Sequence, residues 1–261
     1  PSSAASDVYK RQKYERGLGT FIDNHHVKIQ KSKEENKTIY AENIIIATGS
    51  KPRTIPNIDV DEKIIMTSDG VDHMKSFPKS MVIVGAGVIG CEYATIFSNF
   101  GKTKVYLIDR SDRILPFEDT DISDMISKNL KEKGVTIHNK AQLERLEVKD
   151  GEVEYELSYK DGKKEIIRVE KALLSVGRKL CIDGLKMENA GVTLSKRGVH
   201  IGDINTQTNI PNIYVVGDAS GHISLVNVGE LEGRYAVERM FSKKYYPCLL
   251  YTSPSPRDVE E

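Results

Sequence analysis

The stretch that decides the fold is MVIVGAGVIGCEYATIFSNFGKTKVYLID, which runs from Met81 to Asp109. A short apolar run leads into the turn GAGVIG at residues 85–90, and a stretch with helical character follows until Gly101. A second apolar run, residues 105–108, ends in Asp109. Strand, tight turn, helix, strand and acid in this order are typical of a βαβ unit that binds a dinucleotide.

The three glycines of the turn have separate tasks. Gly85 permits the sharp turn out of the strand, Gly87 has no side chain to keep the backbone away from a pyrophosphate, and Gly90 lets the helix pack closely on the strand. The free N–H groups and the positive dipole end of the helix, where Val88 and Ile89 stand, would hold the phosphates.

Asp109 lies nineteen residues after Gly90. A carboxylate is expected near this spacing, where it accepts hydrogen bonds from a ribose 2′-hydroxyl. A glycine-rich turn alone would also be compatible with a merely structural role. The preceding strand, the helix, the second strand and the acid all agree, and together they favour a dinucleotide site.

Composition and charge exclude several classes of protein. The chain has 38 basic and 38 acidic residues, which argues against a partner such as nucleic acid or a membrane surface. The longest apolar runs are only a few residues, too short to span a bilayer. Neither Cys91 nor Cys181 belongs to a CxxC pair or a His/Cys cluster, so no metal site is expected and Cys91 is interpreted as a small buried side chain. The reducing cytoplasm is the expected compartment.

Both ends of the chain look foreign to a natural protein. Residues 2–12 read SSAASDVYKRQ and residues 248–258 read CLLYTSPSPRD. The DNA sequence GATGTGTATAAGAGACAG encodes DVYKRQ, and its reverse complement, shifted by one base, encodes CLLYTS. Two unrelated natural termini would not share one inverted sequence. We therefore interpret residues 1–12 and 248–261 as translated adapter arms and expect the natural part, 13–247, to be truncated at both ends.

Three other segments share a pattern in which an apolar run stops at a glycine. They are NIIIATGS at residues 43–50, ALLSVGR at 172–178 and IYVVGD at 213–218. Continuous apolar runs suit strands that are buried on both faces of a parallel sheet. Each glycine either contacts a ligand at the carboxyl edge of the sheet or simply ends its strand, and the recurrence of the pattern favours ligand contact.

The remaining segments predict an α/β architecture. The expected elements are an antiparallel ribbon within residues 13–40, a connection at 51–80 with a short helix at 68–74, a helix at 119–133, a strand at 135–138, an antiparallel meander at 142–169 with Asp-Gly turns, and a helix at 225–241. Residues 79–197 therefore read as one complete Rossmann-like nucleotide-binding domain with a meander.

The motifs IIIATGS, GAGVIGCEYA, ALLSVGR and IYVVGDAS occur in this order and at similar spacing in the two-dinucleotide flavoprotein disulfide reductases, a family that the chain resembles over residues 13–247. Within the family, the stretch from GAGVIGCEYA to LIDRSDRILPFEDTDIS is most similar to the soluble pyridine nucleotide transhydrogenase branch, and next to the dihydrolipoamide dehydrogenase branch. The resemblance implies a three-layer NAD(P)-binding domain at 79–197, inserted between pieces 13–78 and 198–247 of a partial FAD-binding domain of the same type.

The resemblance also implies roles for single residues on the nicotinamide nucleotide side. These are the fingerprint Gly85, Gly87 and Gly90 with Val88 and Ile89, the ribose carboxylate Asp109, the nicotinamide-side residue Glu92 and the backbone contact Gly177. An acid at Asp109 repels a 2′-phosphate, while Arg110 and Arg113 attract one. We therefore expect NAD(H) to be favoured and NADP(H) to be tolerated.

On the flavin side, the resemblance implies three contact segments. They are the strand end Ala47, Thr48 and Gly49, the ribityl-binding motif Gly217 and Asp218, and the helix start Ser224, Leu225, Val226 and Asn227. A helix N-terminus beside the pyrimidine ring would stabilise a reduced, anionic flavin. Arg178 is either a surface cation or a group near the bound FAD.

In this family the first FAD fingerprint and the redox CxxxxC pair would lie upstream of residue 13, and a C-terminal dimerisation domain with a His-Glu acid/base pair downstream of residue 247. We expect the parent to be a cytoplasmic, homodimeric FAD enzyme that moves hydride between NAD(P)H and FAD, and the fragment alone to be inactive. The alternatives are a disulfide reductase of the dihydrolipoamide dehydrogenase type and, from another class, a non-catalytic NAD-binding module.

Overall fold

The computed structural model describes residues 12–31, 35–195, 198–199 and 206–241. The chain divides into two compact units. Unit 1 comprises Pro1–Ser50 and Leu180–Glu261, and unit 2 is the continuous stretch Lys51–Lys179. Apart from Gln12, the predicted adapter arms lie outside the described residues.

Unit 2 is built on a five-stranded sheet of order β6-β13-β7-β8-β9 in which all pairs are parallel. Its elements are β6 (Ile65–Met66), α2 (Ser68–Val71), β7 (Ser80–Val84), α3 (Val88–Asn99), β8 (Lys104–Ile108), α4 (Thr120–Glu132), β9 (Thr136–His138), β10 (Gln142–Lys149), β11 (Glu152–Ser158), β12 (Lys164–Val169) and β13 (Lys171–Leu174).

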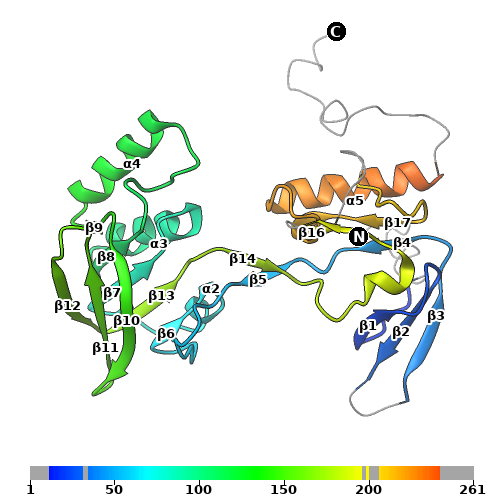
Figure 1. Ribbon diagram of the computed structural model, residues 1–261, viewed down its shortest axis with the longest axis horizontal. Coiled ribbons are helices and arrows are strands. Elements are labelled where there is room, and N and C mark those ends of the chain that lie inside the picture. The colour runs from blue at the N-terminus through cyan, green and yellow to red at the C-terminus, as the bar shows by residue number, and fades with distance from the viewer. Residues whose placement is uncertain (1–11, 32–34, 196–197, 200–205, 242–261) are drawn as a thin grey trace, which may run out of the picture. The chain divides into compact units, whose positions relative to one another are not determined.

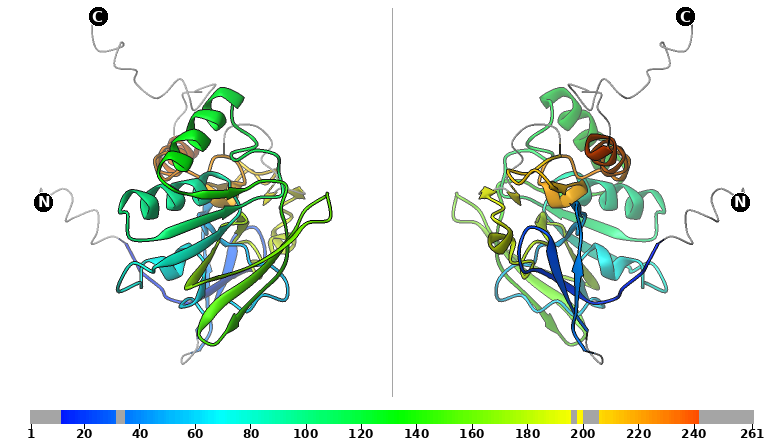
Figure 2. Two further views of the ribbon diagram at one scale, coloured as in Figure 1. Left: turned by 90° about the vertical axis from the view of Figure 1, so that its left-hand side faces the viewer. Right: turned by 90° about the vertical axis from the view of Figure 1, so that its right-hand side faces the viewer.

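The sheet of unit 2 has a helical layer on one face and the meander β10–β12 on the other (Figures 1 and 2). Successive residues of a strand point to opposite faces. Ile83 accordingly packs in one cluster with Ala94 and Phe97 of α3, while the next residue, Val84, packs in a second cluster with Tyr155 of the meander. Because both faces of β7 are covered, its sequence is apolar from Met81 to Val84, and the expected three-layer α/β fold is confirmed.

The meander is held by its turns and by one ion-pair cluster. Asp150 and Gly151 both have positive φ, 53° and 81°, as a two-residue hairpin turn requires. Glu154 of β11 accepts from Arg145 at 2.8 Å, Lys149 at 2.7 Å and Arg168 at 2.9 Å. These three cations lower the pKa of Glu154 to about 2.

Unit 1 contains a three-stranded antiparallel sheet, β1-β2-β3, and a parallel pair, β4 and β17. Its elements are β1 (Leu18–Phe21), β2 (His26–Gln30), β3 (Lys37–Tyr40), β4 (Ile44–Ile46), η1 (Met187–Ala190), β15 (Leu194–Ser195), β16 (Gly198–Val199), β17 (Ile213–Val215), η2 (Gly217–Ser220) and α5 (Val226–Phe241).

The parallel pair of unit 1 is also buried on both faces. Ile213 packs in one cluster with Phe21 of β1 and Ile46 of β4. Tyr214, which points the other way, packs with Ala236 of α5. The helix and the antiparallel sheet therefore cover opposite faces of this pair, as Figure 1 shows.

Two expectations need correction. The segment 51–80 is more than a connection, because its buried residues Ile65 and Met66 form the edge strand β6, and its helix α2 is only four residues long. The closing segment 172–178 is two strands, β13 and β14 (Arg178–Leu180), because the chain turns at Gly177, where φ is +103°. The compact units divide at Lys51 and Lys179, and Met187 packs in the core of unit 1. The nucleotide-binding domain bounds 79 and 197 stay a prediction.

The chain passes between the two units in β5 (Ser50–Pro52) and β14, which are neighbours in a two-stranded sheet. Within the part of the chain that the structure describes, no helix has both the length and the apolar character needed to cross a bilayer.

The glycine turn gives a prediction for stability. A Cβ on Gly90 would lie 1.9 Å from the carbonyl oxygen of Gly85, whereas a Cβ on Gly87 would meet nothing within 4 Å. We expect Gly90→Ala to lower the free energy of unfolding by about 1–3 kcal/mol through overpacking, and Gly87→Ala to lower it by about 1 kcal/mol or less. Urea unfolding of both variants checks the order, and equal losses would contradict the close approach.

The Glu154 cluster gives a prediction for pH. Because the folded pKa lies near 2, below the ordinary 4.5, the carboxylate stabilises the fold fully above about pH 4.5 and loses this effect as the pH falls toward 2. Glu154→Gln should therefore lower the melting temperature at neutral pH, and the gap to wild type should narrow in acid. Thermal melts across this range, with the exposed Glu152→Gln as control, measure the gap. A gap that is constant with pH would contradict the role of the charge.

Candidate nucleotide-binding site

The turn that follows β7 requires glycine at Gly85. Its φ is +100°, and a Cβ there would lie 2.5 Å from the carbonyl oxygen of Ser175. The Gly85 N–H donates to the carbonyl of Ile108 at 2.9 Å, so the turn begins while the chain is still paired with β8. The sharp exit from the strand, expected from the sequence, thus has a steric cause in this fold.

The start of α3 is open to a ligand. Gly87 is its N-cap, with φ −75° and ψ −169°, and no side chain caps the helix. The helices α2 and α4 are capped, by Thr67 and Asp119 respectively. Because nothing within 4 Å would meet a Cβ on Gly87, a phosphate can approach the first N–H groups of the helix, at Val88 and Ile89.

The carboxylate of Asp109 is tied to this turn. One of its oxygens accepts from the Ala86 N–H at 2.7 Å, and the other accepts from the Ser111 N–H at 2.8 Å. The end of β8 and the glycine turn are therefore joined directly. A carboxylate oxygen can accept more than one hydrogen bond, so Asp109 can still receive a ribose hydroxyl beside a phosphate held at α3.

Ser175 supports the glycine turn, and the sequence motifs did not single it out. Its hydroxyl donates to the carbonyl oxygens of Val84 at 3.0 Å and Gly85 at 2.8 Å. It thereby fixes the glycine turn from the side of β13. Its position in ALLSVGR, two residues before Gly177, was the available signal. Gly177 itself has φ +103° and free space around its Cα.

Two residues of α3 next to the turn differ in exposure. Glu92 is exposed, so its carboxylate is accessible to a ligand. Cys91 is 5% exposed, as expected, and its thiol donates to the Ala86 carbonyl at 3.5 Å. Burial, together with the charges of Asp109 and Glu92, raises the pKa of Cys91 to about 11. Cys91 is therefore a neutral packing residue and no nucleophile.

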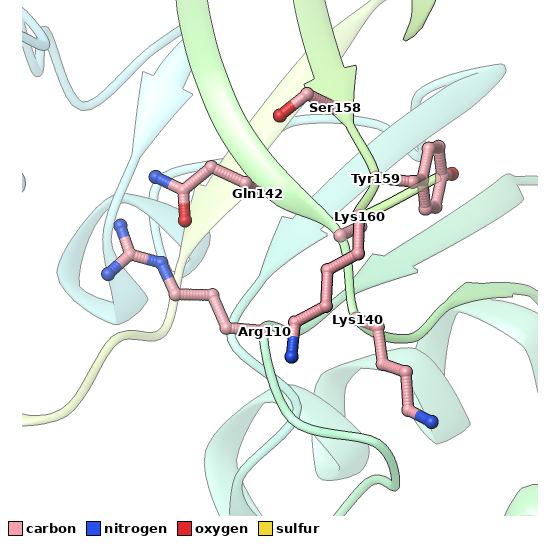
Figure 3. Close-up of a pocket in the computed structure, with 7 residues that line it drawn as sticks. Arg110, Lys140, Gln142, Ser158, Tyr159 and Lys160 are labelled. Atoms are coloured by element: carbon pink, nitrogen blue, oxygen red, sulfur yellow. The ribbon is translucent and has the colours of Figure 1, made fainter. Parts of the chain in front are cut away.

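The two arginines after β8 have different positions. Arg113 donates to the hydroxyl of Thr120 at 3.2 Å and to the carbonyl of Pro116 at 3.1 Å, so it holds the loop that leads into α4. Arg110 lines a pocket at the other end of this segment (Figure 3).

In unit 1 the structure brings two of the flavin-side segments together. Since β4 and β17 are parallel and in register, the segments that follow them, 47–49 and 217–218, lie at the same edge. The hydroxyl of Ser50 donates to the Asp218 carboxylate. Gly49 and Gly217 both have positive φ, 69° and 62°, which brings the backbone into a conformation that other residues rarely adopt.

The helix α5 packs against this edge through glycine. The Cα of Gly229 lies 3.9 Å from where a Cβ of Gly217 would be. One turn later, Glu232 accepts from the Gly217 N–H at 2.6 Å, and burial raises the pKa of its carboxyl. Glu232 is a second residue that the motifs did not reveal, because its partner is fifteen residues away in sequence.

The remaining flavin-side residues are less constrained. Ser224, Leu225, Val226 and Asn227 are exposed at the start of α5. Arg178 lies in β14 and belongs to unit 2, and its carbonyl accepts from Arg53 at 3.4 Å. Its place beside the flavin therefore stays a prediction. Among the described residues, no cluster of His, Cys, Asp or Glu could hold a metal ion.

Comparison with known proteins identifies the family of the chain. The family model described as pyridine nucleotide-disulphide oxidoreductase matches residues 5–233. A dihydrolipoyl dehydrogenase of Bacillus subtilis is 34% identical over 92% of this chain and 52% of its own length. A soluble pyridine nucleotide transhydrogenase of Marinobacter nauticus is 35% identical over 97% of this chain and 55% of its own length. The chain thus spans about half the length of the curated relatives it matches.

Solved structures give the same family. The HOCl-induced flavoprotein disulfide reductase RclA from Escherichia coli has 28% identity and a TM-score of 0.76, over 88% of this chain and 51% of that one. LpdA from Mycobacterium tuberculosis has 25% identity and a TM-score of 0.78, over 88% of this chain and 50% of that one. The chain therefore belongs to the pyridine nucleotide-disulphide oxidoreductases, a family of enzymes that use FAD and a nicotinamide nucleotide.

Proposed function

We propose that the parent protein transfers hydride between NAD(P)H and FAD, as a soluble pyridine nucleotide transhydrogenase does. One observation carries the proposal: the uncapped start of α3 with open space at Gly87, beside an Asp109 carboxylate that is tied to the same turn. A pyrophosphate needs N–H donors and close backbone approach, and an adjacent ribose needs an acceptor. These requirements are met within one βαβ unit.

Each residue has a defined task in this proposal. The N–H groups at Val88 and Ile89 hold the pyrophosphate, and Asp109 holds the ribose. Glu92 and Gly177 contact the nicotinamide half. When bound, FAD supplies a ring that accepts or returns a hydride. We favour NAD(H) as the substrate of this site.

The flavin side is proposed to use the edge formed by β4 and β17. Ala47, Thr48 and Gly49 approach the FAD with their backbone, Asp218 bonds the ribityl chain, and residues 224–227 face the pyrimidine ring. Two observations support the binding of FAD at this edge. Gly49 and Gly217 have positive φ, and the hydrogen bond from the Ser50 hydroxyl orients the Asp218 carboxylate.

A second candidate is a disulfide reductase of the dihydrolipoyl dehydrogenase type, since relatives of both names match this chain almost equally, at 34% and 35% identity. The sequence of the full-length gene distinguishes these two candidate functions. A CxxxxC pair upstream of the present chain would overturn the transhydrogenase proposal. A full-length protein that purifies colourless and takes up no FAD would favour the third candidate, a non-catalytic NAD-binding module.

We propose a cytoplasmic parent that acts as a homodimer and has neither nucleic acid nor membrane as a partner, while the present piece alone is inactive. The balanced charge of the chain, with 38 basic and 38 acidic residues, supports the absence of nucleic acid.

Asp109 gives the test of nucleotide binding. Asp109→Ala should weaken NADH binding by roughly 10- to 150-fold, because a ribose hydroxyl loses a charged acceptor worth about 1.5–3 kcal/mol. Asp109→Asn, which keeps an acceptor for the Ala86 N–H, should lose less. Titration with NADH, followed by nucleotide fluorescence, measures both affinities, and thermal melts control for folding. Unchanged NADH affinity in Asp109→Ala would contradict the ribose assignment.

Glu232 gives a test of the flavin-side edge. Glu232→Ala leaves the Gly217 N–H without its acceptor, so we expect a loss of about 1–3 kcal/mol in the free energy of unfolding. Glu232→Gln keeps a carbonyl acceptor and avoids burying a charge, and it should retain most of the stability. Chemical unfolding of the two variants checks this difference. Equal losses would show that the carboxyl bond does not support the turn.

A further inference from the structure

Helix α4, in the helical layer of unit 2 (Figure 1), packs one face on the core and turns the other to solvent. Leu130 is 1% exposed, and Ile126 packs against the same core cluster. The other face carries two large apolar side chains, Ile122 with 49% and Met125 with 68% of the surface exposed. Single exposed apolar residues need no explanation, but these two are three residues apart and are therefore neighbours on the helix surface. They form one exposed apolar patch.

Charged side chains border this patch in a fixed order. Asp121 lies about one turn before Met125 and Lys128 about one turn after it, both within about 60° of Met125 around the helix axis. Both are exposed. Among the described residues, no hydrogen bond or ion pair engages either side chain. The Met125 face of α4, which consists of Asp121, Ile122, Met125, Lys128 and Asn129, therefore has an apolar centre between an acid and a base.

The Met125 face is complementary to itself when a second copy meets it in antiparallel orientation. A two-fold axis at Met125 places Asp121 of each copy beside Lys128 of the other. The same axis places Ile122 beside Asn129. A two-fold contact is isologous, so both ion pairs form at once. A parallel pair would instead place like charges together, Asp121 against Asp121 and Lys128 against Lys128. The order of charges therefore selects the antiparallel arrangement.

We propose that the Met125 face of α4 is a self-association surface and that its occupant is the same face of a second copy of this chain. Met125 and Ile122 supply the apolar contact, and Asp121 and Lys128 fix its orientation. The helix dipoles favour this orientation as well, because antiparallel helices place the positive end of one beside the negative end of the other. The surface is separate from the dimerisation domain expected downstream of residue 247, and its use does not depend on nucleotide binding.

The size of the surface sets the strength of the contact. The helix Thr120–Glu132 is about 20 Å long, and one face of such a helix is small beside the roughly 1,000 Å² that a stable specific interface buries. Exposed ion pairs add little to the affinity. The expected dimer is therefore reversible, with a dissociation constant of about a micromolar or weaker.

Sedimentation velocity of the full chain, at concentrations from about 1 μM to about 1 mM, tests the surface. Wild type should shift reversibly from monomer to dimer. Met125→Lys, which places two cations at the centre of the contact, should abolish the dimer. Asp121→Lys and Lys128→Asp should each weaken it about tenfold, because every reversal turns two symmetric ion pairs into repulsions. The double variant Asp121→Lys/Lys128→Asp should return to within about threefold of the wild-type affinity, because the exchanged charges pair again.

Lys131→Asp is the matched control, since it makes the same charge change at an exposed position of α4 outside the Met125 face. It should leave the affinity within about threefold of wild type, and thermal melts check that every variant is folded. A chain that stays monomeric at all these concentrations would overturn the inference. A dimer that survives Met125→Lys would overturn it too, since that dimer would use another surface. A double reversal that fails to restore association, or a control as weak as Lys128→Asp, would contradict the pairing of Asp121 with Lys128.

Discussion

The architecture of unit 2 depends on how closely three strands approach at the turn after β7. The carbonyl of Gly85 lies where a Cβ of Gly90 would be, and the Ser175 hydroxyl bonds that carbonyl from β13. On the other side, the Asp109 carboxylate bonds the Ala86 N–H from β8. Helix α3 can begin where it does only because no side chain intervenes. The packing of the helical layer and the exposure of its N–H groups therefore have the same cause.

In unit 1 a helix also packs closely against the turn that ends a strand, but different groups stabilise that turn. There too a strand ends in glycine, and a helix packs against it through a second glycine, Gly217 against Gly229. Here the free N–H of the turn is taken by a side chain of the helix, Glu232. In unit 2 the corresponding helix start is left without a side-chain cap. The difference supports the proposal that the turn before α3 binds a phosphate, whereas the turn at Gly217 is stabilised by Glu232.

Much of the fold and part of the site could be predicted from sequence, because the decisive signals are local. Glycine spacing, apolar runs and Asp-Gly turns each act within a few residues, and they gave the βαβ unit and the meander. Ser175 and Glu232 could not be found in this way, since strand pairing brings Ser175 to Gly85 and the packing of α5 brings Glu232 to Gly217. The edge strand β6 was missed because two residues are too few to show a pattern.

The pairing of β5 with β14 places the two ends of unit 2 side by side. Unit 2 is one uninterrupted stretch, and its two ends leave through neighbouring strands. A segment whose two ends are adjacent can be removed or exchanged with little change to the rest of the fold. Unit 2 can therefore be exchanged as one continuous segment while the fold of unit 1 is retained.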